Sequence, residues 1–460
     1  MFAAQTYVER RNRLKAQFDS GLLLFLGNEE SSMNYVDNTY PFRQDSSFLY
    51  YFGVDRPGCA ALIDLDEGRT VVFGDDLTLD DIVWTGLQPT LAELAGRAGI
   101  DATAGAAELA SRLKQANGRD IRFLPPYRPE HQLKLFKLLG IDPDQLAAKA
   151  SVPLIRAVVE MRARKSAEEL LELERAVDLS VDMHLAAMRM ARPGVTEAAI
   201  AAKVTEVAQA AGATLAYPVI GTVHGETLHN HHYLSTLQSG QMYLLDAGAE
   251  TAAHYDGDLS STCPVDAEFT DRQRDIYEVV LSAHLGAIAA LKPGVPFREV
   301  HLAACRTMVE GLKALGLMKG NAADAVEQGA HALFFPCGLG HMLGMDVHDM
   351  ESLGEVWVGY EGQPKSTQFG LKSLRLARPL QPGFVLTVEP GIYFIPELIR
   401  RWERDRHCLE FINYPKLESY FDFSGIRIEE NVTITQDGAR ILGKARPRTA
   451  REIASVRKDG

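Results

Sequence analysis

The chain has 460 residues, of which 46% are hydrophobic and 24% are charged. This is the composition of an ordinary globular protein, and the length exceeds one typical core, so we expect two domains. The net charge of −13 argues against nucleic acid or an anionic membrane as a partner, because both are negatively charged.

The N-terminal region and the cysteines together indicate a reducing compartment. The first stretch, MFAAQTYVERRNRLK, is charged and lacks the apolar core of a signal peptide. The apolar run GLLLFLG at 21–27 has the length of a strand and is far too short to span a membrane. The five cysteines are well separated and include no CxxC pair, which argues against a disulfide framework. We therefore expect a cytoplasmic protein.

Residues 21–75 are predicted to be rich in strands, because turn residues separate the segments GLLLFLG, SSFLYYFGV, CAALIDL and TVVFG. Residues 80–150 mix short strands with alanine-rich helical stretches. A long helical pattern follows, and Ser166 with Glu169 forms a capping-box signature that predicts a helix beginning at 166. We place the domain boundary near 160, with a smaller mixed α/β domain over 1–160 and a second domain over 161–460.

The second domain alternates helices with strands, which predicts the α+β fold class. The expected helices cover 166–192, 196–212, 271–291 and 297–315, and the expected strands cover 217–222, 241–248, 332–336, 384–389 and 425–435. Residues 356–378 and the charged run RRWERDRH at 400–407 are predicted to be loops or a solvated helix.

Several common catalytic motifs are absent from the sequence. It contains no HExxH, Walker loop or GxSxG, which argues against the most frequent zinc, phosphate and serine-hydrolase sites. The stretch GLGHMLG approaches a dinucleotide fingerprint, but its third glycine is Gly344, one position late. His341 also stands where a pyrophosphate would have to approach the backbone closely, so a nucleotide site is disfavoured.

Acidic residues instead occur at the ends of apolar strands. Asp246 ends the strand in LLDAG, and Asp258 follows twelve residues later, a spacing that suits the two arms of a hairpin. Glu389 ends the strand in LTVEPGIY. Glu429 lies in SGIRIEEN, where the two-residue period of a strand places it on the same face as Arg427.

Buried charges at such positions cost free energy unless they are paired or bind a metal. Four carboxylates with the imidazole of His341 form a donor set dominated by oxygen. This set carries too much negative charge for one ion and suits two divalent cations about 3.5–4 Å apart. Its hardness favours Mn²⁺, with Co²⁺ or Zn²⁺ as substitutes.

In this order, LLDAG, DLSST, GLGHMLGMDVHD, LTVEPGIY and GIRIEEN resemble the five metal-ligand motifs of the pita-bread metallopeptidases. This family includes methionine aminopeptidase, aminopeptidase P and prolidase. The resemblance covers residues 150–450, approximately. The stretch RQDSSFLYYFGVDRPGCAALIDL also resembles the smaller N-terminal domain of prolidase and aminopeptidase P, which methionine aminopeptidase lacks. The resemblance implies a C-terminal pita-bread domain preceded by this smaller domain.

The resemblance also implies roles for individual residues. The implied metal ligands are Asp246, Asp258, His341, Glu389 and Glu429, with Asp258 and Glu429 bridging the two ions. A hydroxide between the ions would attack the scissile carbonyl, with Glu389 as proton shuttle. His229 and His348 would orient the substrate and stabilise charge on the intermediate, and Arg427 and Tyr393 would position the ligands.

Alternatives exist at some of these positions. His229 is preferred for its 17-residue lead to Asp246, with His231 as the fallback. Asp256 competes with Asp258, but DLSSTCP matches the family pattern better. That pattern has Arg where this chain has Ser261, and prolidase and aminopeptidase P have His where this chain has Cys337. The role of Cys337 stays open, either as a small core residue or as a thiol at the site mouth.

The expected reaction is hydrolysis of the Xaa-Pro bond in dipeptides, as in prolidase. Its main support is GLKSLRLARPLQPG at 370–383, which resembles the prolidase stretch whose first arginine pairs with the free carboxylate of the dipeptide. Here that arginine is Arg375, for which the alternative is a surface salt bridge. The long insertion between Glu389 and Glu429 also resembles prolidase.

Other activities remain alternatives to this prediction. One is an aminopeptidase P that releases the N-terminal residue from longer Xaa-Pro peptides. Another is a side activity on organophosphate triesters, which occurs in some relatives of prolidase. A non-catalytic scaffold is disfavoured, because all five ligand positions are present. The resemblance further implies a homodimer.

Overall fold

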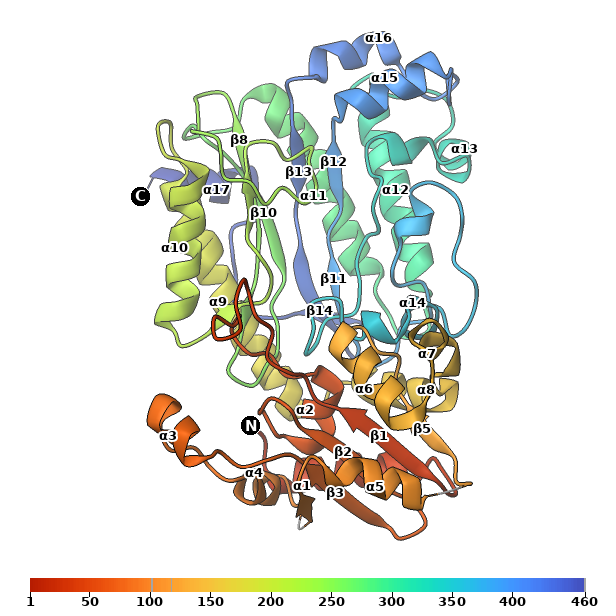
Figure 1. Ribbon diagram of the computed structural model, residues 1–460. Coiled ribbons are helices and arrows are strands. Elements are labelled where there is room, and N and C mark those ends of the chain that lie inside the picture. The colour runs from red at the N-terminus through yellow and green to blue at the C-terminus, as the bar shows by residue number, and fades with distance from the viewer. Residues whose placement is uncertain (101, 117, 459–460) are drawn as a thin grey trace. The chain divides into compact units, whose positions relative to one another are not determined.

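The structure is a computed structural model that describes residues 1–100, 102–116 and 118–458 (Figure 1). The chain forms two compact units, one of Met1–Arg162 with Ser352–Gly354, and the other of Ala163–Glu351 with the chain from Glu355 onward. Helix α8 covers Val152–Ala163, so the boundary expected near 160 falls within a helix. Among the residues described, no helix is both long and apolar enough to cross a membrane.

The first unit is built on a sheet with strand order β4-β3-β2-β1-β5. Strand β1 pairs antiparallel with β2 and parallel with β5, and all five of its residues are buried. The strands are β1 Leu22–Leu26, β2 Ala60–Asp64, β3 Arg69–Phe73, β4 Thr103–Ala104 and β5 Ile121–Phe123. The helices are α1 Ala4–Lys15, α2 Ser46–Phe52, α3 Leu79–Thr85, α4 Leu91–Arg97, α5 Glu108–Gln115, α6 Pro129–Leu139 and α7 Pro143–Lys149, followed by α8.

The segment SSFLYYFGV was predicted as a strand, and this prediction is wrong, because it forms helix α2. The side chain of Asp45 accepts a hydrogen bond from the backbone N–H of Phe48, and Gly53 ends the helix in the left-handed conformation. Every residue of α2 is buried. A helix buried on all sides shows no amphipathic period, so its short apolar run cannot be told from a buried strand.

Long helices flank the strands of the second unit. The capping box predicted at Ser166 and Glu169 is present and begins α9, and Thr270 and Gln273 form another at the start of α11. The helices are α9 Ala167–Met190, α10 Glu197–Ala210, α11 Asp271–Ala290, α12 Phe297–Ala314, α13 Ala322–Glu327, α14 Glu355–Val358, α15 Pro396–Arg404, α16 Tyr414–Leu417 and α17 Ala450–Lys458. The short 3₁₀ helices are η1 Ala330–Leu333, η2 Glu351–Leu353, η3 Leu371–Ser373 and η4 Glu418–Tyr420.

The strands of this unit form small sheets that meet at its centre. Their orders are β10-β8-β7, β11-β14-β15, β12-β13 and β6-β9. Helix α9 contacts β8, β9 and β10, whereas α11 contacts β11, β12 and β13 (Figure 1). The strands are β6 Thr214–Leu215, β7 Ile220–Thr222, β8 Met242–Ala247, β9 Ala249–Glu250, β10 Leu259–Pro264, β11 Val385–Val388, β12 Gly391–Tyr393, β13 Gly425–Arg427, β14 Glu430–Ile434 and β15 Ala439–Ile441.

Two of the predicted strands differ from the structure. The segment 332–336 is not a strand, because Gly329 takes a φ of 80° and the chain turns into η1, where the N–H groups of Phe334 and Phe335 both donate to the carbonyl of His331. The segment 425–435 is divided, because β13 pairs with β12 while β14 pairs with β11. Overall, the expected α+β class is confirmed.

Candidate metal centre

Five acidic or imidazole side chains meet in the second unit, each at a strand end or in the segment beside one. One ligand atom from each of Asp258, His341 and Glu429 lies within 4.8 Å of the others. The Nε2 of His341 is 3.2 Å from Oδ2 of Asp258 and 3.6 Å from Oε1 of Glu389. Asp246, Asp258, His341 and Glu429 are each at most 9% exposed. The structure therefore brings together the five predicted ligands.

The pairing of β8 with β10 brings the two aspartates to the same side of the unit. The strands run antiparallel, as the spacing predicts, with Ser260 opposite Asp246. Asp258 directly precedes β10, and its backbone N–H donates to Oδ1 of Asn431 on β14 at 2.9 Å. The hydroxyl oxygen of Tyr217 lies within hydrogen-bond distance of both aspartates, at 2.5 Å from Oδ1 of Asp258. Its contacts with both carboxylates join them into one cluster.

The segment around His341 is held close to β11 without forming a helix. A side chain on Gly340 would place its Cβ 2.0 Å from the carbonyl oxygen of Thr387, so only glycine fits this approach. The backbone N–H of His341 donates to Oγ1 of Thr387 at 3.1 Å. Its Nδ1 lies 3.0 Å from the carbonyl oxygen of Met342, a contact that leaves Nε2 directed at the carboxylates. This is how a protein orients an imidazole toward a metal.

His348 lies beside His341, although the intervening residues are irregular. The two ring centroids are 4.4 Å apart, with the ring planes tilted by 70°. The Nδ1 of His348 is 2.6 Å from Oε2 of Glu351. Burial and the neighbouring His341 lower the pKa of His348, so its neutral form is favoured.

His229 lies in the segment between β7 and β8 and is exposed. Burial of part of the ring lowers its pKa, and Asp246 opposes this effect. Asp246 and Arg427 are thus both within electrostatic range of His229. The structure brings His229 near the cluster without a direct contact to a predicted ligand among the interactions described.

Arg427 and Tyr393 bond to each other, and Arg427 also bonds to the carboxylate of Asp246. The guanidinium of Arg427 donates to Oδ2 of Asp246 at 2.6 Å, to Oγ of Ser260 at 2.8 Å and to the Tyr393 hydroxyl at 2.9 Å. Ser260 in turn donates to Oε2 of Glu429 at 2.7 Å. Asp246 and Glu429 are thereby both linked to the buried guanidinium of Arg427, Glu429 through Ser260.

Arg375 lies at the edge of this arrangement. Its Nη1 donates to Glu351 at 2.7 Å and to Glu355 at 2.5 Å, and its side chain is 33% exposed. Since Glu351 also binds His348, a chain of contacts leads from Arg375 to His341. Hydrogen bonding to His348 and the charge of Arg375 lower the pKa of Glu351 to about 2.

Burial and mutual repulsion perturb the carboxylates strongly. Burial raises the pKa of Glu389 to about 7, and burial with the neighbouring carboxylates raises the pKa of Glu429 and of Asp246. Burial would also raise the pKa of Asp258, but the hydrogen bond and charge of His341 lower it below its usual value. The same pairing raises the pKa of His341 against the effect of burial.

These residues fit a divalent-cation site. Four carboxylates face Arg427 and one imidazole, so ionising all of them needs further positive charge. The donors are hard oxygens with one oriented imidazole nitrogen, which suits divalent metal ions better than soft ones. The cluster can therefore hold metal ions whose charge lowers the pKa of each acid.

Sequence reasoning missed several residues of this site. Ser260 could have been found, because the two-residue period of β10 places it on the same face as Asp258. Tyr217 carries no local signal, since it reaches the aspartates only through the tertiary fold.

Ser261 stands where the family has Arg, and its Oγ is 2.6 Å from Nδ1 of the buried His184. Cys337 is partly buried near Glu389, and burial raises the pKa of its thiol to about 12.

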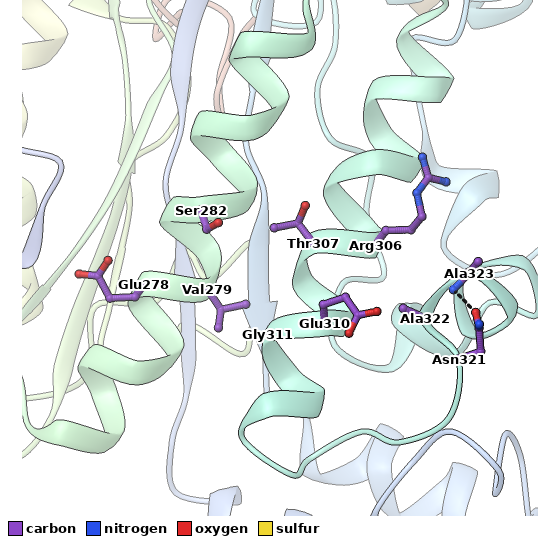
Figure 2. Close-up of a pocket in the computed structure, with 10 residues that line it drawn as sticks. All are labelled: Glu278, Val279, Ser282, Arg306, Thr307, Glu310, Gly311, Asn321, Ala322 and Ala323. Atoms are coloured by element: carbon purple, nitrogen blue, oxygen red, sulfur yellow. Dashed lines mark hydrogen bonds between the residues drawn. The ribbon is translucent and has the colours of Figure 1, made fainter.

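A separate hollow of about 810 Å³ lies over α11, α12 and α13 (Figure 2). It is lined by Glu278, Val279, Ser282, Arg306, Thr307, Glu310, Gly311, Asn321, Ala322 and Ala323. None of the predicted site residues lines it, and it has no imidazole or thiol. The convergence of buried acids around His341 identifies the chemical centre better than the size of this hollow does.

Known proteins match the chain along nearly its whole length. Residues 172–436 match Metallopeptidase family M24, and residues 7–122 match the aminopeptidase P N-terminal domain. The Xaa-Pro dipeptidase of Homo sapiens is 31% identical over 98% of this chain and 91% of its own. The Xaa-Pro aminopeptidase of Escherichia coli is 30% identical over 98% of this chain and 97% of its own. The structure of proline aminopeptidase P II from Yersinia pestis superposes with a TM-score of 0.83 at 28% identity, covering 100% of both chains.

These matches confirm the pita-bread fold of the second unit and the smaller mixed α/β domain before it. The metallopeptidase assignment made from the five motifs is confirmed as well. The chain belongs to metallopeptidase family M24, a family of hydrolases that use divalent metal ions.

Proposed function

We propose that this protein hydrolyses Xaa-Pro bonds and that dipeptides are its preferred substrates. The proline part of the proposal is supported by relatives named as Xaa-Pro dipeptidase and as Xaa-Pro aminopeptidase, which match the chain equally well. An Xaa-Pro amide has no N–H and a fixed φ, so a site for it cannot rely on clamping that N–H. Polarising the carbonyl is the available alternative.

The proposed ligands of two divalent cations, preferably Mn²⁺, are Asp246, Asp258, His341, Glu389 and Glu429. When bound, these ions would polarise the scissile carbonyl and acidify the attacking water. The remaining chemistry belongs to the protein. Glu389, whose pKa burial raises to about 7 in the metal-free protein, accepts a proton at its carboxylate and returns it to the leaving proline nitrogen.

The two proposed substrate-contacting histidines differ in how firmly they are held. His348 is fixed by the bond from its Nδ1 to Glu351. Its Nε2 donates a hydrogen bond to the substrate carbonyl in the protonated ring, whose charge Glu351 compensates as negative charge develops on the substrate. His229 lies on an exposed segment within electrostatic range of Asp246 and orients the substrate from that side. Arg427 and Tyr393 act at a distance by holding Asp246 in position.

The preference for dipeptides rests on Arg375. Its guanidinium is linked through Glu351 to His348, whose ring contacts His341. An arginine so placed can pair with the free carboxylate of a short substrate through two parallel hydrogen bonds. A longer peptide has no carboxylate at that distance from its first bond.

The test compares Ala-Pro with Ala-Pro-Ala on chelator-treated protein to which Mn²⁺ is returned. We expect faster cleavage of Ala-Pro, and Arg375→Ala should raise KM for Ala-Pro by about tenfold while leaving KM for Ala-Pro-Ala unchanged. Lys372→Ala is the matched control, because Lys372 lies in the same segment and contacts the ring of Phe369. An unchanged KM for Ala-Pro in Arg375→Ala would remove Arg375 from the substrate site.

An aminopeptidase P activity is the second candidate. Arg375 is already paired with Glu351 and Glu355, so its charge is compensated without a substrate. The Yersinia pestis structure, which covers the whole chain, also bears the name of an aminopeptidase P. Faster cleavage of Ala-Pro-Ala would favour this activity and leave Arg375 as a surface ion pair.

We further propose a homodimer. Helix α3 has no buried residue, and it exposes 76% of Leu79, 72% of Val83 and 87% of Trp84. Apolar side chains gathered in this way are typical of an interface. Light scattering should give the mass of two chains, and Trp84→Lys should shift it toward one chain.

A further inference from the structure

A second cluster of metal-binding side chains lies in the same unit, apart from the five ligands described above. His301 and Cys305 are four residues apart on α12, so they share one face of that helix. His331 on η1 completes the cluster, and one ligand atom from each residue lies within 4.8 Å of the others. His301 and Cys305 are 0% exposed and His331 is 2% exposed.

The imidazoles of this cluster have unused hydrogen-bonding capacity. The Nδ1 of His301 and both ring nitrogens of His331 are buried without a hydrogen-bond partner of standard geometry. Burial lowers the pKa of His301 to about 3 and that of His331 to about 4, the Val326 carbonyl opposing the second shift. Both rings are therefore neutral, the form that binds metals. Leaving the His331 nitrogens unpaired costs free energy, and a metal bound at one of them would supply it with a partner.

The spacing of the donor atoms suits one metal ion. The Sγ of Cys305 is 3.5 Å from Nε2 of His301. With the metal–sulfur and metal–nitrogen bonds of about 2.3 and 2.0–2.1 Å that are known for zinc, two donors of one ion would lie about 3.6–3.8 Å apart at angles of about 109–120°. The sulfur and nitrogen are already close to that separation, and the donor atom of His331 lies within 4.8 Å of both.

The charge around the cluster favours a monovalent ion. One thiolate neutralises Cu⁺ fully, whereas a divalent ion would leave a net positive charge in a buried site. Arg298 and Arg306 lie within electrostatic range of His301 and Cys305 respectively, and their charges oppose such a residual positive charge. Two imidazoles with one thiolate are also a soft donor set, unlike the oxygen-rich set around His341.

We propose that His301, Cys305 and His331 form a separate binding site for a single cuprous ion. On binding, the Cys305 thiol loses its proton to solvent as the sulfur–copper bond forms, and both imidazoles bind as neutral ligands. Because burial raises the pKa of this thiol, the metal-free site holds the protonated form, and binding releases one proton. The ion would join α12 to η1, at the start of the segment that leads to His341. This proposal does not depend on the peptidase activity.

The test uses Mn²⁺-loaded protein titrated anaerobically with Cu⁺ in the presence of a chromophoric Cu⁺ chelator. We expect the native chain to withhold one Cu⁺ per chain and Cys305→Ala to withhold none. Cys263→Ala is the matched control, because Cys263 is a buried cysteine of β10 in the same unit, and it should behave as the native chain. The bound ion should also raise the Tm of the native chain and not that of Cys305→Ala.

Further variants keep the outcome decisive. If Cys305→Ala fails to fold, Cys305→Ser and His331→Phe provide the same comparison, with circular dichroism as the check on folding. Equal Cu⁺ retention by native chain and variants would overturn the assignment of the site, as would no retention by the native chain. In a parallel titration with Zn²⁺, the native chain could retain one Zn²⁺ that Cys305→Ala does not retain. If the native chain retained this Zn²⁺ and no Cu⁺, the choice of ion would be overturned.

Discussion

The buried ion pair between Lys165 and Asp349 yields a quantitative prediction. Their Nζ and Oδ2 atoms are 2.7 Å apart, and each side chain is 1% exposed. The backbone N–H of Asp349 donates to the carbonyl of Met342 at 2.9 Å, so the pair anchors the segment that carries His341. Gly344 leaves room for it, because a Cβ there would lie 2.3 Å from Oδ2 of Asp349.

Replacing Lys165 with Met leaves the carboxylate of Asp349 buried without this cation, a change that typically costs about 3–5 kcal/mol. Protonation of Asp349 limits the cost at pH 7 to the middle of this range. From an unfolded pKa of about 3.9, holding the carboxyl protonated at pH 7 costs about 4 kcal/mol. In the variant the folded-state pKa of Asp349 is raised above its unfolded value. The folded protein therefore keeps its stability below about pH 4, where Asp349 is protonated in both states, and loses stability as the pH rises. At pH 5 the cost should fall to about 1.5 kcal/mol.

The assay is chemical unfolding of the native chain and the variant at pH 5 and pH 7. Lys444→Met is the matched control, because the Lys444–Asp182 pair has a similar separation of 2.6 Å but is 42% and 47% exposed. The control should lose less than about 1 kcal/mol at either pH. The double variant Lys165→Met with Asp349→Asn should recover much of the loss. A loss in Lys165→Met no larger than in the control, or one independent of pH, would refute this reasoning.

Three further predictions concern the candidate metal centre. Because burial raises the pKa of Glu389 from 4.5 to about 7, the stabilising protonated form is present below pH 4.5 and is lost as the pH rises through 7. Between pH 4 and pH 8 the free energy of unfolding of the metal-free chain should thus fall by on the order of 3 kcal/mol relative to that of Glu389→Gln. The measurement is urea unfolding, and an equal pH dependence of the two free energies would contradict this prediction. Tyr217→Phe removes the hydroxyl shared by two carboxylates and should weaken Mn²⁺ binding by about 10-fold or more, as measured by calorimetric titration; an unchanged affinity would exclude that role. Gly340→Ala should lower stability by at least about 1–3 kcal/mol, because its Cβ would lie 2.0 Å from a carbonyl oxygen, whereas Gly286→Ala, which meets nothing within 4 Å, should be neutral or stabilising in thermal unfolding.

Much of the second unit could be predicted from the sequence, because its signals are local. The capping box at Ser166 lies within one turn of the helix that it starts, and each of its two side chains bonds to the backbone N–H of the other residue. The acids of the candidate centre follow apolar strands, and four carboxylates buried beside one imidazole call for metal ions whatever the arrangement. Motif order then identifies the family, since five spaced motifs rarely occur together by chance.

The tertiary structure decided the features that depend on contacts between distant segments. SSFLYYFGV became a helix because it is buried on every side, and this removes the amphipathic pattern that sequence reasoning needs. The segment 425–435 was divided because its two halves pair with different strands.

The same holds for the details of the sites. Tyr217 joins two carboxylates that lie 29 and 41 residues away along the chain. The pairing of Arg375 with two glutamates, and the meeting of His331 with α12, likewise arise only when the chain is folded. The sequence by itself determined which groups need partners, because burial and charge are properties of residue type and local pattern. Only the folded chain determined which partners they find, because hydrogen bonds and ion pairs depend on distances of a few ångströms between segments that are remote in sequence.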